Sequence, residues 1–273
     1  MPDATNAPSL GLSSLILNHR IGAIFSSIIC AALSFGINCG HGLLGYRSNM
    51  DKSAPSSGAK RVDAFEYWDA NGSSIDEAVA LCLKSFKGDA VTAAFSGGNP
   101  ELVDLNYRSM ILAALHSGEV YFATDASGKI VAIGVWFAPG QELWATEEQR
   151  ALGFDDVIKA SSPKTIEWLM GTYKPTMAEF VPKALSPKAK KDTWFANVIA
   201  TDPAYQRRGL ARALIEPVYQ KALANDTILT TCAVSDMNCT VFKKLGWEYK
   251  GRVDIPSPVS SDSFPIICLT RGP

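Results

Sequence analysis

Six consecutive residues have the composition of an anion-binding helix start: Gln206, Arg207, Arg208, Gly209, Leu210 and Ala211. They follow a predicted strand over 194–201 and a proline at position 203, and they lead into a predicted helix over 208–224. The first turn of a helix presents unpaired backbone N–H groups at its positive dipole end. Small residues at 209 and 211 let a bulky anion approach the backbone, and the arginines add positive charge. A diphosphate is therefore the favoured ligand.

The same residues could instead be the solvated start of an ordinary helix, because short motifs often match by chance. The stretch itself contains neither the G-x-G-x-x-G pattern of dinucleotide-binding loops nor a G-K-[ST] triplet. Those two classes of nucleotide site are excluded at this position.

Two neighbouring segments connect this stretch to a known family. The run from Trp194 through Asp202-Pro203 to Ile215 resembles the signature core of the GNAT N-acetyltransferase superfamily, strand–D-P-x-[YF]-[QR]-x-x-G-x-[GA]–helix. Farther on, Phe242-Lys-Lys-Leu-Gly-Trp247 resembles the next family signature, a short helix that ends in an aromatic-x-Lys-x-Gly-aromatic turn. The resemblance covers roughly 61–273 and is sharpest over 194–250.

The resemblance implies a fold and a donor site. The fold would be a three-layer α/β/α sandwich on a mixed, mostly antiparallel sheet, as in acyl-CoA N-acyltransferases. Acetyl-CoA would be the co-substrate, with its pyrophosphate on the N–H groups of 207–211 and Gln206 leading in. The pantetheine arm would pair with the strand backbone and form a hydrogen bond with an asparagine near the start of the later helix. Asn238 is the asparagine available there, although Ser235 fits the family spacing better. The residues implied for the arm are Ile199, Ala200, Thr201 and Asn238.

Catalytic groups are harder to assign. Many family members have a tyrosine, as the acid for the departing thiolate, where this chain has Phe242. Another hydroxyl or water could serve, and a thiolate with an ordinary thiol pKa near ~8.5 needs little acid help. The alternative acids are Tyr249, Ser235 and Tyr205, and the candidate bases are Asp236, Glu179, Asp202 and Glu66. Each acidic residue could equally be a surface or capping group, so catalytic residues are left unassigned.

The acceptor is expected to contact the segment 140–191, because the family uses the corresponding segment in this way. The aromatic and methionine side chains of this segment suit a small-molecule amine, or they form the core face of two helices: Trp144, Trp168, Met170, Tyr173, Met177 and Phe180. Its lysines are interpreted as a solvated loop, with attraction of the CoA 3′-phosphate as an alternative: Lys183, Lys188, Lys190 and Lys191.

The first sixty residues differ from the rest. An uncharged run lies between Arg20 and Arg47, and as a helix its residues 21–45 could span a bilayer. Serines and glycines weaken that interpretation, so a cleaved targeting segment and an extension without a role in the fold stay open. A polar linker over 48–60 follows. We therefore divide the chain into an N-terminal extension, 1–60, and an acetyltransferase domain, 61–273.

Composition excludes some partners. The net charge of −1 gives no bulk attraction to nucleic acid. The 6 cysteines form no C-x-x-C pair and the 3 histidines do not cluster with them, so no metal site is predicted. Free thiols in a reducing compartment are expected, since a core of this size needs no disulfides.

Periodicity predicts alternating strands and helices after residue 61. Strands are expected over 62–67, 120–124, 130–137, 194–201, 227–234 and 264–270, and helices over 73–88, 101–116, 208–224 and 237–245. The segment 139–191 is expected to be irregular apart from a helix over 163–173.

These features together predict an N-acetyltransferase that moves an acetyl group from acetyl-CoA to an amine by direct attack in a ternary complex. We expect a cytoplasmic protein, or a membrane-anchored one whose domain faces the cytosol. The alternatives are a non-catalytic CoA-binding module and a membrane-tethered scaffold or sensor. The sequence does not predict the oligomeric state.

Overall fold

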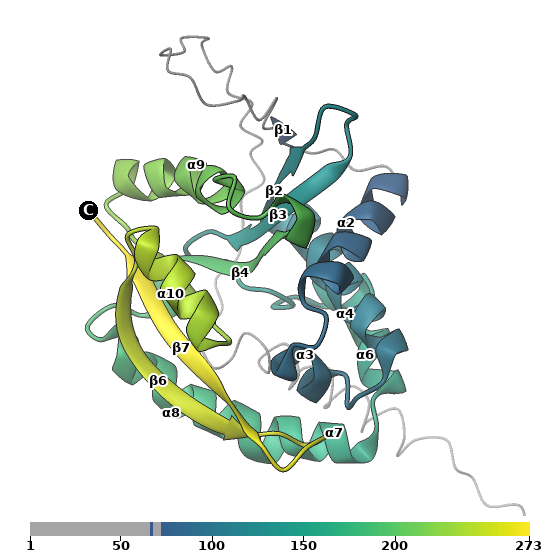
Figure 1. Cartoon of the computed structure of the whole chain (residues 1–273). Helices are drawn as coiled ribbons and strands as arrows, with labels where there is room; N and C mark the ends of the chain where they lie inside the picture. The colour runs from purple at the N-terminus through teal and green to yellow at the C-terminus, as the bar shows by residue number, and fades with distance from the viewer. Residues whose placement is uncertain (1–65, 68–71) are drawn as a thin grey trace, which may run out of the picture.

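Seven strands form one sheet in the computed structural model, which describes residues 66–67 and 72–273 (Figure 1). The order is β1-β2-β3-β4-β5-β7-β6, and only the β4–β5 pair is parallel. The strands are β1 Glu66–Tyr67, β2 Glu119–Thr124, β3 Ile130–Phe137, β4 Trp194–Thr201, β5 Leu229–Ala233, β6 Glu248–Pro256 and β7 Ser263–Arg271. The predicted mixed, mostly antiparallel sheet is confirmed.

Helices cover both faces of this sheet. Apolar residues of α2, α4, α6 and α8 form one buried cluster with one face, and those of α9 and α10 form a second cluster with the other. Three layers result, as expected. The helical segments are α2 Gly72–Ser85, α3 Ala90–Phe95, α4 Pro100–Ser117, α5 Glu147–Ala151, α6 Phe154–Ala160, α7 Pro163–Trp168, the π-helical turn η1 Leu169–Tyr173, α8 Lys174–Leu185, the 3₁₀ turns η2 Lys190–Asp192 and η3 Pro203–Tyr205, α9 Leu210–Ala224 and α10 Asp236–Lys244.

The turn of the β2–β3 hairpin is determined by its local sequence. Asp125 accepts hydrogen bonds from the backbone N–H groups of Ser127 at 2.9 Å and Lys129 at 3.2 Å, which closes the turn. Gly128 supplies the left-handed backbone, with φ of 85°. Every residue of β3 is buried, because helices pack on both of its faces.

The prediction for 139–191 was wrong, since this segment is largely helical. The expected helix over 163–173 is α7 continued by η1, and the chain then runs directly into α8. The segment joins the other end of the sheet through Trp168, whose indole N–H donates to the carbonyl of Pro256 at 2.7 Å. The helices α7 and α8 therefore close one side of the molecule below β6 and β7 (Figure 1).

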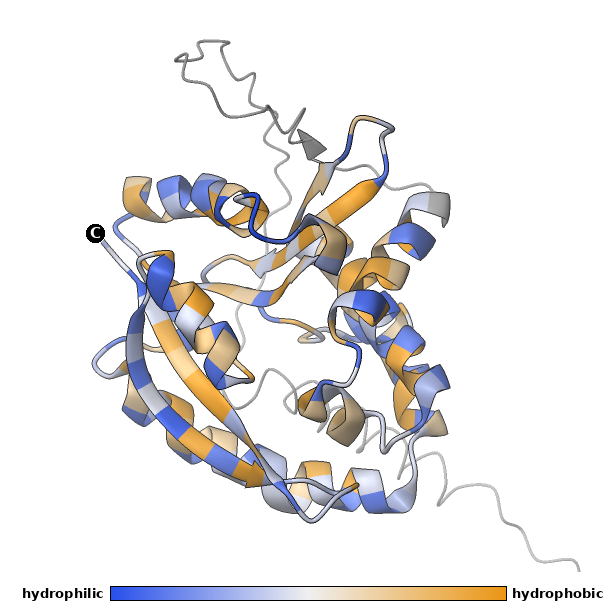
Figure 2. Cartoon of the chain, viewed as in Figure 1, coloured by the Kyte–Doolittle hydropathy of each residue, from blue (hydrophilic) through white to orange (hydrophobic). Residues whose placement is uncertain are grey.

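Two further elements, α3 and β6, were not predicted. The strand β6 lies at the sheet edge and carries polar residues along most of its length, whereas β7 beside it is mostly apolar (Figure 2). An edge strand with charged residues and a terminal proline does not show the alternation of a half-buried strand.

The expected membrane segment 21–45, the linker and the domain boundary near 60 lie outside the described residues, as does the first part of the strand predicted over 62–67. Among the helices that the structure describes, none has both the length and the apolar character needed to cross a bilayer.

Candidate active site

The strands β4 and β5 separate part of the way along their length. Their pairing is confined to three pairs, from Trp194 opposite Leu229 to Ala196 opposite Thr231. On its other side β4 stays paired with β3 as far as Thr201 opposite Ala132. Within the described chain no strand pairs with 197–201 on the β5 side. The backbone of these residues therefore forms an open edge inside the sheet, which an extended ligand could pair with.

A β-bulge at Asn197 accompanies this separation. Trp136 of β3 pairs with Ala196 and the adjacent Val135 pairs with Val198, so Asn197 is an extra residue in the ladder. The side chain of Ala196 packs in the cluster under α9, whereas that of Val198 packs in the cluster under α2 and α4. A bulge bends a strand and increases its twist. The bulge thus begins where the pairing with β5 ends.

The loop after β4 is fastened at both ends. Asp202 is buried, and its carboxylate accepts from the Ala204 N–H at 2.9 Å and from Lys84 Nζ at 2.7 Å. The bond from Lys84 is the main reason that the pKa of Asp202 lies below its usual value. The Tyr205 hydroxyl donates to Asp125 at 2.8 Å, which raises the pKa of Tyr205 and ties the loop to the β2–β3 turn.

The start of α9 leaves backbone donors free of helical partners. Gly209 is its N-cap, with φ of 85°, and makes no side-chain cap. The first helical bond runs from the Ala213 N–H to the Gly209 carbonyl at 3.0 Å. The N–H groups of Leu210, Ala211 and Arg212 therefore lack an intrahelical acceptor and carry the positive end of the helix dipole. This geometry is what a phosphate group requires.

Three arginines surround this helix start, and they differ in what holds them. Arg208 donates to the Ala204 carbonyl at 3.1 Å, and its guanidinium lies 4.8 Å from the Tyr205 ring centroid, so it braces the loop. Arg207 and Arg212 are exposed, and within the described residues neither is paired with a carboxylate. Arg207 also has a left-handed backbone, with φ of 62°. Sequence reasoning missed Arg212, although its place in the first turn of the predicted helix could have identified it.

The residues expected to support the pantetheine arm fall at the start of α10. Ser235 is the N-cap of this helix and accepts from the Asn238 N–H at 3.1 Å. Asn238 is half-buried. Phe242 packs against Trp247, with ring centroids 5.1 Å apart, so its role in this chain is to pack α10 against the sheet.

A cavity of about 160 Å³ adjoins the point where β4 and β5 part. Its walls are mostly apolar, with a few polar side chains on the helix side and at the strand ends. Its lining comprises Phe86, Asp89, Val91, Thr92, Phe95, Asn106, Tyr107, Met110, Leu143, Tyr173, Met177, Phe195, Ala196, Asn197, Val198, Cys232, Val234 and Ile266.

Four polar residues of the cavity lining come from α3, α4 and the loop between α2 and α3. Asp89 caps α3 by accepting from the Thr92 N–H at 2.7 Å. The Tyr107 hydroxyl lies 3.0 Å from Thr92 Oγ1, and burial raises the pKa of Tyr107, so this phenol stays neutral. The Asn106 Oδ1 atom is buried and accepts no hydrogen bond from the described residues. None of these residues belongs to a motif that the sequence displays.

Three of the acids suggested from the sequence form ion pairs away from the cavity. Asp236 pairs with Arg252 at 2.8 Å, Glu179 pairs with Lys183 at 2.7 Å, and Asp202 pairs with Lys84. The side chain of Glu66 lies outside the description. The suggested hydroxyls of Tyr205, Ser235 and Tyr249 are also absent from the cavity lining. None of the described groups in either set lines the cavity.

The aromatic side chains of 140–191 divide between the two expected roles. Tyr173 and Met177 line the cavity. Trp144, stacked on Phe154 at 4.0 Å, and Trp168 are buried in the core. Met170 and Phe180 are partly buried against the same core.

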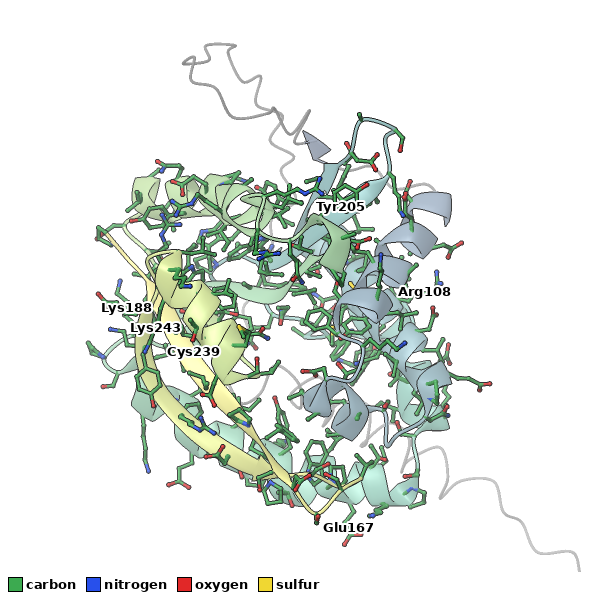
Figure 3. The ribbon with its side chains drawn as sticks, in the orientation of Figure 1. Arg108, Glu167, Lys188, Tyr205, Cys239 and Lys243 are labelled. Atoms are coloured by element: carbon green, nitrogen blue, oxygen red, sulfur yellow. The ribbon has the colours of Figure 1, made fainter. Side chains whose placement is uncertain are left out.

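The lysines of this segment do not act as one cluster. Lys183 pairs with Glu179, and Lys190 is buried 3.9 Å from Glu142 Oε1. Lys188 and Lys191 border a shallow hollow at the first residues of β4, the end opposite to Gly209. Lys188 and Tyr205 lie well apart in Figure 3. Within residues 66–67 and 72–273, no group of three His, Cys, Asp or Glu side chains is arranged to hold a metal ion.

Comparison with known proteins gives a family match. Residues 99–247 match the model described as the acetyltransferase (GNAT) family. No curated protein matches the sequence. Among solved structures, a mutant agmatine N-acetyltransferase in its apo form is similar, with a TM-score of 0.50 and 16% identity over 76% of this chain and 100% of that one.

Two further structures are similar at lower scores. Arylalkylamine N-acetyltransferase 2 from Aedes aegypti has a TM-score of 0.48 and 15% identity, over 76% of this chain and 97% of that one. A structure described as histone acetyltransferase HPA2 and related acetyltransferase, from Corynebacterium glutamicum, has a TM-score of 0.49 and 16% identity, over 77% of this chain and 95% of that one.

Proposed function

The chain belongs to the acetyltransferase (GNAT) family, and on that premise we propose that it is an acetyl-CoA-dependent N-acetyltransferase of a small-molecule amine. The observation that carries this proposal is the separation of β4 from β5 beyond Ala196 and Thr231. The open β4 edge leads on one side to the start of α9 and on the other to the cavity. In this proposal a phosphate site, an open strand edge for the extended arm and an acceptor cavity follow one another.

The donor would use the open edge in the following way. Its pyrophosphate would accept from the N–H groups of Leu210, Ala211 and Arg212, with Arg207 supplying further charge. The Gln206 side chain donates to the Thr201 carbonyl at 3.5 Å, between this loop and the open edge. The pantetheine arm would run beside 197–201, including Ile199, Ala200 and Thr201, with Asn238 facing it from α10. This arrangement delivers the thioester to the cavity between Asn197 and Cys232.

Transfer would then proceed by direct attack. The neutral amine adds to the thioester carbonyl, the carbon–sulfur bond breaks, and the thiolate leaves with the bonding electrons. Holding both reactants together is the main contribution of the protein. Backbone N–H groups at the bulge would donate to the developing oxyanion. The arriving ammonium group first loses one proton to water or to a cavity group, and a second N–H proton leaves in the same way after the addition. Of the acids proposed from the sequence, Asp236, Glu179 and Asp202 are engaged in ion pairs.

A small acceptor is favoured over a peptide because aromatic packing joins α3 to α7 and η1 beside the cavity. Phe95 of α3 contacts both Trp168 and Tyr173, with centroids 5.5 and 4.7 Å apart, and Trp168 in turn is bonded to Pro256. A protein tail would need an open groove across this region. We place the domain in the cytosol, where acetyl-CoA is available, whether residues 1–60 serve as an anchor or as an extension.

The test is release of free CoA from acetyl-CoA by the full-length protein with a panel of amines. We expect release that depends on the amine, together with a product heavier by one acetyl group. A non-catalytic CoA-binding protein is the second candidate, and Phe242 at the family tyrosine position favours it. Tight CoA binding without turnover across the panel would support that candidate and contradict ours.

A further inference from the structure

The cavity chemistry points to one class of acceptor, and this inference rests on the proposed function. We propose that the acceptor is a compact monoamine with an apolar or aromatic body and no carboxylate. In this proposal Asp89 binds its ammonium group on entry, and Asn106 accepts a hydrogen bond from the same nitrogen.

The charge of the cavity supports this choice. Among the described residues that line it, Asp89 is the only Asp, Glu, Lys, Arg or His. Asp89 is half-buried, and no lysine or arginine of the described chain forms an ion pair with it. A carboxylate in a mostly apolar cavity attracts a cation. An amine acceptor arrives as a cation, since its pKa lies near ~10.

The Asn106 amide is the second observation. Its Oδ1 atom is buried without a donor from the described residues, although Asn106 lines the cavity. A buried acceptor without a partner in the protein is available to a donor of a ligand. An N–H of the bound amine would satisfy it.

Size and shape restrict the rest of the molecule. The volume of about 160 Å³ is well below the roughly 300–1,000 Å³ of drug-sized ligand sites. The rings of Phe86 and Tyr107 are stacked, with centroids 5.5 Å apart, and with Phe95 and Tyr173 they provide flat walls. One ring or a short branched alkyl group fits such walls.

The same features exclude two other classes of amine. An amino acid would place its carboxylate in a cavity whose described lining contains no cation to pair with it and one anion to repel it. A polyamine would need a second carboxylate for its second ammonium group. The cavity therefore discriminates against these amines because its described lining has no cation and no second carboxylate, while Asp89 favours a single ammonium group.

The experiment compares 2-phenylethylamine and isoamylamine with L-phenylalanine, L-leucine and spermidine as acceptors for the full-length protein. We expect kcat/KM at least about 100-fold higher for the two monoamines. Equal or faster turnover of an amino acid or of spermidine would overturn the inference while leaving the proposed function intact. If no amine were acetylated, the result would instead contradict the proposed function.

The variant Asp89→Asn tests the role of the Asp89 charge. Asp89→Asn keeps the cap on α3, because asparagine accepts the same N–H bond, and removes only the charge. It should lower kcat/KM for the monoamines about 10- to 100-fold, mainly through KM, without changing CoA affinity. Glu167→Gln is the matched control, since Glu167 is exposed on α7 and points outward (Figure 3). Equal activity of Asp89→Asn and wild type would overturn the role of Asp89.

The variant Asn106→Leu distinguishes a role of Asn106 in binding the acceptor from a role in stabilising the fold. Removing an unsatisfied buried oxygen should raise Tm by about 2–4 °C for a domain of this size. The same change should lower kcat/KM for the monoamines about 10-fold. A variant that loses stability, or keeps full activity, would show that Asn106 has only a structural role.

Discussion

Lys84 Nζ lies 2.7 Å from Asp202 Oδ1, and this ion pair joins the last turn of α2 to the loop after β4. The carboxylate is buried, whereas the lysine side chain is 53% exposed. The two residues are far apart in the sequence, so their contact fixes α2 against the loop that leads to the proposed donor site.

Asp202→Asn should lower the free energy of unfolding at pH 7 by about 1 kcal/mol, because it removes the charge but keeps the cap on Ala204. The pKa of Asp202 is lowered in the folded protein, so its contribution is present above the unfolded value near ~3.9 and is lost as pH falls through the folded value. Thermal melts between pH 7 and pH 3 should therefore show the difference from wild type shrinking. Asp156→Asn is the control, since its pair with Lys159 is exposed. A difference that stays constant as the pH falls below about 3.9 contradicts the assignment.

Gly209→Ala should weaken acetyl-CoA binding by about tenfold, because the new methyl group occupies the place where a phosphate approaches. Gly128→Ala is a close match, since both glycines have φ of 85° and open space around the added carbon. Each change should cost about 1–2 kcal/mol of stability from backbone strain. Calorimetric titration with acetyl-CoA separates them, and equal loss of affinity in both variants would argue against the phosphate site.

Arg212→Gln and Arg207→Gln should each lower CoA affinity about 3- to 10-fold, with the loss shrinking at high salt. Lys188→Gln should leave affinity unchanged, because Lys188 lies at the opposite end of β4. If Lys188→Gln had the larger effect, the CoA phosphates would lie near the lysine segment instead.

Cys232 should be the cysteine of the domain that a small alkylating reagent modifies first. It is half-buried and lines the cavity, whereas Cys268, its neighbour on β7, Cys82 and Cys239 are buried. Burial raises the pKa of Cys82 to about 12, and a hydrogen bond from Cys268 lowers the pKa of Cys232. Mass spectrometry after iodoacetamide treatment measures each site, and acetyl-CoA should slow the reaction at Cys232. Equal rates at Cys82 and Cys232 would contradict the position of the cavity.

The sequence was sufficient for the elements that carry a strong local signal. The strand over 194–201 and the hairpin strand over 130–137 have the predicted bounds, because each is a mostly apolar run that ends two residues before a proline. α3 has six residues, too few for a visible helical period. β6 depends on pairing with β7 for its backbone hydrogen bonds, which no local pattern reveals.

The site was only half predictable for a similar reason. The helix start at Gly209 is contiguous in sequence, so its motif could be recognised. The acceptor cavity draws Asp89, Asn106 and Cys232 from separate elements, and only the fold brings them together. Ion pairs such as Asp236 with Arg252 likewise depend on strand placement. Sequence reasoning could therefore propose these acids but could not exclude them.

The central claim is that CoA lies along the open edge of β4, and a crystal structure of the full-length protein with CoA tests it most directly. We predict pyrophosphate oxygens about 2.7–3.2 Å from the N–H groups of Leu210, Ala211 and Arg212. The pantetheine arm should lie beside 197–201, with its sulfur at the cavity near Asn197. A CoA molecule bound elsewhere, with the β4 edge left open, would contradict the account.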